Sequence, residues 1–183
     1  PSMTITAAEV STNGTSNNAT LSLTFTSNEK TTDFSENDIS VTNGTLSAFG
    51  GSDTEYTVTF TPSADGLCTI NVAADTFTDA LWGSNTAATE FNWTYDVTNP
   101  TMTITAAEGS DGFTSNHAAL SLTFESNEAT TNFAESDITV TNGVLSSFIA
   151  TSSTVYTATF TPFLDGAVTI NVSAGSFTDA IGN

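Results

Sequence analysis

The sequence repeats itself at a spacing of 99 residues. The opening segment PSMTITAAE, Pro1–Glu9, returns as PTMTITAAE at Pro100–Glu108. About 34 of the first 49 positions are identical across this spacing without a gap. One residue is added between Phe148 and Tyr156, where a surface loop would accept an insertion. The repeat predicts two copies of one fold, a first domain over 1–98 and a second over 99–183.

Each copy carries the pattern of an all-β fold. Apolar residues at every second position predict seven strands in copy one, separated by turn signals. The abundant threonines favour strands because they are β-branched, and helix signals are absent apart from a single turn at 34–37. The side chains expected to point inward are Met3, Ile5, Leu21, Leu23, Phe25, Ile39, Val41, Leu46, Phe49, Tyr56, Val58, Phe60, Cys68, Ile70, Val72, Phe91, Trp93 and Tyr95.

The dipeptide Asn43-Gly44 predicts a tight turn between two of these strands. Asn-Gly is the pair that best fits a type I′ hairpin, because both central residues of that turn need a positive φ. We therefore expect the strand with Ile39 and Val41 to form a hairpin with the strand that carries Leu46 and Phe49.

The two copies differ at their ends. Copy one continues into Thr89–Val97 (TEFNWTYDV), an alternating segment that predicts a final strand. Copy two stops at Asn183, so it is expected to lack its last strand within this chain. The chain also begins at Pro1 without an initiator methionine, which suggests a processed product or a piece of a longer array. Alternatively, a neighbouring chain donates the missing strand and so builds a filament.

Charge excludes several classes of partner. The chain has 20 acidic residues, one lysine and no arginine, which gives a formal net charge of -19. Such a surface repels nucleic-acid phosphates and anionic lipids, but it attracts cations and is tolerated best where salt screens it. A hydrophobic fraction of 38% and 13 phenylalanines supply cores, yet no apolar run is long enough for insertion into a membrane. The single cysteine, Cys68, is expected to be a core residue.

Several motifs together resemble the bacterial Ig-like repeats of large surface adhesins, of the biofilm-associated and RTX types. They are TFTSNE at 24–29, DISVTNG at 38–44, YTVTFTP at 56–62, Asp65-Gly66, TDA at 78–80, TDAIGN at 178–183 and the linker DVTNP at 96–100. The resemblance covers essentially the whole chain. It implies two tandem immunoglobulin-like Greek-key β-sandwiches in a long extracellular array, often stiffened by calcium and without catalytic activity. The longer loop at 81–85 and Asn99 in the linker depart from the family pattern.

Acidic residues shared by the copies predict a cation site where the two copies join. Alternate loops of such a sandwich meet at each end, and flexible loops with several carboxylates suit Ca2+, which takes 6–8 oxygen ligands. The candidate ligands are Glu9, Asp65, Asp96, Asn99, Glu128, Asp137 and Asp179. The same side chains could instead cap turns or remain solvated, as aspartates often do. Both interpretations stay open on the sequence alone.

Five sequons mark acceptor sites for N-glycosylation if the source is eukaryotic: Asn13, Asn18, Asn43, Asn92 and Asn171. Catalysis has little support. The only histidine, His117, has Asn18 as its counterpart in the other copy, so the repeats share no catalytic histidine.

These observations predict a non-enzymatic spacer on a cell surface, whose partners are neighbouring repeats or copies of the same protein. A module that binds a surface glycan or protein through its loops is the alternative, as is a filament subunit that polymerises by a donated strand.

Overall fold

The chain divides into two compact units in the computed structural model, which describes all residues 1–183. Unit 1 covers Pro1–Val97 and unit 2 covers Thr98–Asn183. Each unit is built of β-strands and contains one short 3-10 helix, Glu36–Asp38 (η1) or Glu135–Asp137 (η2). The all-β prediction and the single predicted turn near Phe34 are confirmed.

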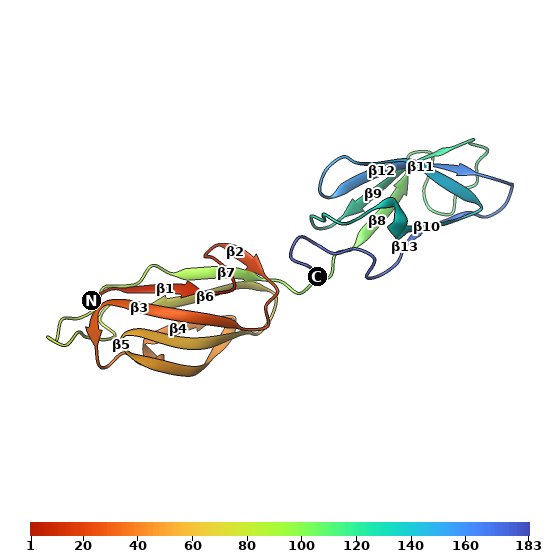
Figure 1. Ribbon diagram of the computed structural model, residues 1–183. Helices are drawn as coiled ribbons and strands as arrows, with labels where there is room; N and C mark the ends of the chain where they lie inside the picture. Colours follow the sequence, from red (N-terminus) through yellow and green to blue (C-terminus); the bar gives the residue numbers. More distant parts are fainter. The chain divides into compact units, whose positions relative to one another are not determined.

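Unit 1 has two sheets that face each other across one core (Figure 1). The first has the order β1–β3–β5, with β1 Met3–Ala7, β3 Leu21–Thr31 and β5 Gly44–Pro62. The second has the order β2–β7–β6–β4, with β2 Gly14–Ser16, β7 Phe91–Tyr95, β6 Gly66–Val72 and β4 Ile39–Thr42. All neighbours pair antiparallel except β2 and β7, which run parallel.

The core of unit 1 follows the predicted alternation. Side chains of β3 and β6 supply its centre, and six apolar ones are at most 1% exposed: Leu21, Leu23, Phe25, Cys68, Ile70 and Val72. From β7, Trp93 sets its ring edge-on to Phe60 at a centroid distance of 4.8 Å. Burying aromatic and aliphatic side chains in this way removes the largest apolar areas from water and holds the two layers together.

The predicted hairpin at Asn43-Gly44 is wrong. The strand before it, β4, pairs with β6 in one sheet, whereas β5 pairs with β3 in the other, so the chain crosses between sheets at this point. Of the two residues of this dipeptide, only Asn43 has a positive φ (55°), whereas a type I′ turn needs two. Gly44 is needed for another reason, since a Cβ there would lie 2.1 Å from the Phe60 ring. The two strands predicted around Leu46 and Tyr56 form one long element, β5, which folds back on itself, with Gly44 beside Phe60 (Figure 1).

Unit 2 repeats only part of this arrangement. Its larger sheet has the order β11–β12–β9–β8, with β8 Met102–Ala106, β9 Leu120–Ser126, β11 Gly143–Ala150 and β12 Val155–Pro162. Its smaller sheet has two strands, β10 Ile138–Thr141 and β13 Thr169–Val172. Residues 98–183 contain no counterpart of β7 and none of β2, and β13 is four residues long where β6 has seven. The prediction that the second sandwich lacks its last strand within this chain is confirmed.

Replacing Gly44 by alanine is expected to destabilise unit 1 by about 2 kcal/mol or more, because the Phe60 ring is fully buried and cannot move aside. Gly50→Ala is the matched control. A Cβ at Gly50 meets nothing within 4 Å, so this variant should stay within about 0.5 kcal/mol of the parent. Both tryptophans, Trp82 and Trp93, lie in unit 1, so denaturation followed by tryptophan fluorescence reports this unit alone. Equal stability of the two variants would contradict the packing described for Gly44.

Candidate functional site

Two acidic side chains meet at the end of unit 2 where the chain enters it. Glu128 follows β9, and Asp179 lies beyond β13. Carboxylate oxygens of the two residues lie within 4.8 Å of one another. Asp179 is buried, with 5% of its surface exposed. A close pair of carboxylates, one of them buried, is the part of the predicted cation site that unit 2 brings together.

Asp179 also organises its own loop. Its Oδ1 atom accepts backbone N–H groups from Ile181 at 2.9 Å, Gly182 at 2.7 Å and Asn183 at 2.9 Å. Its Oδ2 atom accepts the Asn183 side-chain amide at 2.9 Å. Desolvation by burial alone would raise the pKa of Asp179, but these bonds outweigh it and hold the pKa below its usual value. The carboxylate is therefore a turn cap whether or not a cation binds.

Unit 1 builds the same arrangement from Glu29 and Asp79. The Oδ1 atom of Asp79 accepts N–H groups from Leu81 at 2.7 Å and Gly83 at 2.9 Å. The bonds from Gly83 and Leu81 lower the pKa of Asp79, and contact with the Glu29 side chain contributes in the same direction. Two units with different loop lengths thus place one glutamate and one capping aspartate together.

A further acidic residue, Asp33, ties two loops of unit 1 together. Its carboxylate accepts both the N–H (3.0 Å) and the hydroxyl (2.8 Å) of Thr78, and the Thr31 hydroxyl at 3.1 Å. In unit 2 the neutral Asn132 connects the equivalent loops, since its Oδ1 accepts the Thr178 N–H at 3.0 Å. Desolvation would raise the pKa of Asp33, but the Thr78 bonds outweigh it and lower the pKa. Sequence reasoning missed this residue; the exchange of TTDF for TTNF between the copies was the available signal.

The predicted ligand Glu9 binds a backbone N–H in unit 1. Glu9 accepts the Ser22 N–H with both oxygens, at 3.0 and 2.9 Å, as Glu108 does with Ser121. Desolvation would raise the pKa of Glu9, yet the Ser22 bonds outweigh it and lower the pKa.

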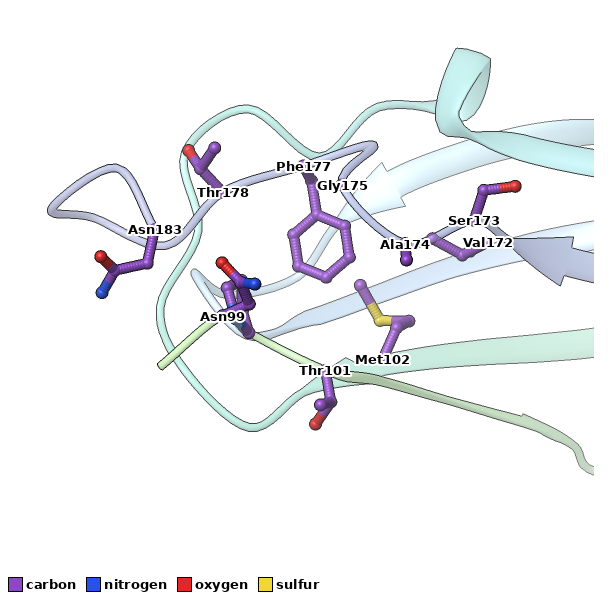
Figure 2. Close-up of a pocket in the computed structure, with 11 residues that line it drawn as sticks. Asn99, Thr101, Met102, Val172, Ser173, Ala174, Gly175, Phe177, Thr178 and Asn183 are labelled. Carbon is purple, nitrogen blue, oxygen red and sulfur yellow. The ribbon is translucent and has the colours of Figure 1, made fainter. Parts of the chain in front are cut away.

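The remaining four predicted ligands are divided between the units, two in each. In unit 1, Asp65 accepts the Val97 N–H at 3.0 Å, and the N–H of Asp96 donates to the Ser16 carbonyl at 3.2 Å. In unit 2, Asp137 accepts the Ala134 N–H at 2.8 Å at the start of η2, and Asn99 lines a hollow beside Phe177 (Figure 2).

The five sequon asparagines occupy different settings. Asn13 and Asn18 lie exposed in the loop regions around β2, whereas Asn92 lies on β7 and Asn171 on β13. The Asn43 amide donates to the Ala64 carbonyl at 2.7 Å, so a glycan on that nitrogen would remove the bond. Asn142 makes the same bond to Leu164 in unit 2, at 2.9 Å.

The two residues with reactive side chains, Cys68 and His117, belong to different units. Cys68 is fully buried in the core of unit 1, where burial raises the pKa of its thiol. Its predicted role as a small core residue is confirmed. His117 is exposed in the loop between β8 and β9.

The division into two β-sandwich units agrees with a comparison against protein families. The family model for the bacterial Ig-like domain matches the chain twice, at residues 1–95 and 96–183. The chain therefore belongs to the bacterial Ig-like domain family. Among solved structures it is similar to InvD of Yersinia pseudotuberculosis, with 16% sequence identity and a TM-score of 0.39. That match covers 98% of this chain and 55% of the InvD chain. No curated protein matches the sequence. None of the helices has the length and apolar character needed to cross a membrane.

Asp33→Ala is expected to destabilise unit 1 by roughly 1 kcal/mol at pH 7, because three hydrogen bonds from Thr31 and Thr78 lose an exposed acceptor. Asp33→Asn should cost less than about 0.5 kcal/mol, since unit 2 already uses Asn132 at this position.

The pKa of Asp33 is lower in the folded state, so the stabilisation by its charge is complete above its unfolded pKa of about 4 and is lost as the pH falls through the folded value. The stability difference between the parent and Asp33→Asn should therefore shrink as the pH falls below about 4, as followed by tryptophan fluorescence. A difference that grows on acidification would contradict the assignment.

Proposed function

We propose that the chain is a non-catalytic structural segment of an extracellular surface protein, in which a repeat such as unit 1 adds length to an array of domains. The observation that carries this proposal is the path of the chain through unit 1. Pro1 lies at one end, where its carbonyl accepts the Thr86 N–H at 2.9 Å. From Thr86 the chain continues through β7 to the opposite end of the unit, which it leaves after Tyr95, the partner of Gly66 in the sheet (Figure 1). A domain entered and left at opposite ends is suited to extend an array.

Strand pairing in unit 1 also suits a load along the chain. Tension on the N-terminal side reaches β2 through β1, and tension on the C-terminal side reaches β7 directly. Because β2 and β7 are parallel, opposite pulls shear their hydrogen bonds together instead of opening them one at a time. Unit 2 lacks this pair, and Asn99 and Asn183, close to its two ends, line the same hollow.

Surface charge supports an extracellular, salt-containing setting. The one ion pair joins Lys30 and Asp53 at 3.5 Å. Both side chains are exposed to solvent, so the pair adds little to the stability of unit 1. Stability must therefore come from the two cores and the hydrogen-bond network, against the self-repulsion of a net charge of -19. Salt at physiological or marine concentrations shortens the range of this repulsion to roughly 10 Å or less.

Stretching single molecules between their two ends is expected to give two separate unfolding events. Unit 1 should unfold at the higher force, because its parallel pair β2–β7 is sheared, whereas unit 2 is opened from one end. The events can be assigned by contour length, since 97 residues extend by about 35 nm and 86 residues by about 31 nm. A single event, or a higher force for unit 2, would contradict the load-bearing role.

We also propose that the pair Glu128 and Asp179, like Glu29 and Asp79, contributes ligands to a weak Ca2+ site. The donors fit calcium in kind, because they are carboxylate oxygens without nitrogen or sulfur competitors. The Oδ1 atom of Asp179 is bonded to three N–H groups, Oδ2 accepts the Asn183 amide, and Oε1 of Glu128 accepts the Asn127 amide at 3.0 Å. An ion would therefore share these carboxylate oxygens with the hydrogen bonds that they already accept. Water or other oxygen ligands must complete the 6–8 that calcium takes.

Calcium is expected to raise the melting temperature of the parent chain, and Glu128→Gln should reduce the effect. At a concentration about 100 times Kd, one bound ion adds about 2.7 kcal/mol to the free energy of unfolding. The measurement is a calorimetric titration at constant ionic strength, with magnesium as the control for general screening. An equal response to both ions, or no response at millimolar calcium, would remove calcium from the proposal and leave the spacer function untouched.

A further inference from the structure

The sequence contains three Asn-Gly dipeptides, Asn13-Gly14, Asn43-Gly44 and Asn142-Gly143. An asparagine that precedes glycine is prone to react with its own backbone, because glycine has no side chain to block the approach of its nitrogen to the asparagine amide carbon. All three asparagines have a positive φ, at 63°, 55° and 55°. Their relative reactivity in the folded chain is therefore set by the hydrogen bonds and the packing around each dipeptide.

Hydrogen bonds hold the side chains of Asn43 and Asn142. The Asn43 amide donates to the Ala64 carbonyl at 2.7 Å, and the Asn142 amide donates to the Leu164 carbonyl at 2.9 Å. Each amide has to give up this bond before its carbon turns toward the backbone nitrogen of the next residue. Reaction at these two asparagines therefore carries the cost of an additional broken hydrogen bond.

The glycines that follow them, Gly44 and Gly143, are confined as well. Each begins a strand, β5 or β11, and lies against a buried ring. A Cβ would come within 2.1 Å of Phe60 in unit 1 and within 2.2 Å of Phe160 in unit 2. Moving either glycine nitrogen would disturb the start of a strand and the core beneath it. The folded structure therefore protects both dipeptides.

The dipeptide Asn13-Gly14 has neither restraint. The Asn13 side chain is exposed and makes no hydrogen bond. The Gly14 N–H donates to the Ser11 carbonyl at 3.0 Å, a bond that closes the turn and does not belong to the sheet. The turn leads into β2, a strand of three residues at the edge of its sheet. Such short edge segments open locally at little cost in free energy, so the Gly14 nitrogen is the easiest of the three to free.

We propose that Asn13 rearranges spontaneously to isoaspartate in the folded protein. The Gly14 nitrogen attacks the side-chain carbon of Asn13, the new C–N bond closes a cyclic succinimide, and the side-chain amide leaves as ammonia with the proton from the Gly14 nitrogen. Water then opens the ring at one of its two carbonyl carbons, which gives aspartate or isoaspartate. The reaction needs only water as co-reactant.

Isoaspartate at this position would loosen the parallel strand pair of unit 1. Its main chain runs through the former side chain and gains one methylene group directly before Gly14, the residue that pairs with Trp93 on β7. The backbone N–H of Asn13 also donates to the Asn92 carbonyl at 2.7 Å, so the extra length acts between two contacts with β7. The modification is independent of the proposed spacer function, but a lower resistance to force rests on it.

The test is to age the full folded chain in a mildly alkaline buffer and to follow the three dipeptides by peptide mapping with mass spectrometry. Isoaspartate is expected to form at Asn13 about tenfold faster or more than at Asn43 and Asn142. The same chain in denaturant is the control, in which the three rates should agree within about twofold, since folded contacts are lost there. Equal rates in the folded chain, or a slower reaction at Asn13, would overturn the proposal.

The effect on β2 is tested with the variant Asn13→Gly, which cannot form the ring. Unit 2 already has Gly112 at this position, also with a positive φ, so the variant keeps the turn. Amides of residues 14–16 should lose protection from hydrogen exchange by about tenfold or more in the modified parent, but not in the aged variant. Full protection in the modified parent would contradict the loosening of β2.

Force measurements on the aged chain separate this inference from the spacer function. The modified parent should unfold unit 1 at a lower force than the aged Asn13→Gly variant, because the sheared pair β2–β7 is weakened. Lost protection at residues 14–16 without a lower force would count against the load-bearing role of this pair and not against the modification.

Discussion

The last strand of unit 1, β7, is the element on which the rest of the sandwich depends. It pairs with β6 on one side and β2 on the other, and it brings Phe91 and Trp93 into the core. In unit 2, where no such strand is present, β2 has no counterpart and β13 keeps only four residues. The two halves of one chain thus compare a closed and an open sandwich with nearly the same sequence.

Most of the acidic side chains described above act as hydrogen-bond acceptors for backbone N–H groups, not as partners in ion pairs. With one lysine and no arginine, the chain pairs only Asp53 with a cationic side chain, Lys30, and its other 19 acidic residues need different partners. Asp33, Asp79 and Asp179 instead accept backbone N–H groups at loop ends, and Glu9 and Glu108 do so beside β3 and β9. Such bonds to a charged acceptor are stronger than neutral ones and lower the carboxylate pKa values. They fix loops and leave the net charge of the chain unchanged.

Much of the fold could be predicted because alternation is a local signal. The inward side chains of β3 and β6 follow from the period of two, and the absence of a last strand follows from comparing the copies. The predicted hairpin at Asn43-Gly44 failed because the dipeptide rule assumes that its flanking strands pair, whereas β4 pairs with the distant β6. The role of Asp33 could not be seen either, since Thr78 comes beside it only in the folded unit. The short β2 could not be predicted because its only neighbour in the sheet is β7, which is distant in the sequence.

Removing β7 from unit 1 tests this account most directly. A chain that ends at Asn85 should reproduce the open state of unit 2: amides of residues 14–16 and 66–69 should lose protection from hydrogen exchange, while those of β1 and β3 remain protected. We expect this pattern because residues 14–16 pair only with β7, and most of residues 66–69 also pair with β7 alone. If residues 66–69 stay as protected as in the full chain, β7 does not close the sandwich, and the account given for unit 2 is wrong.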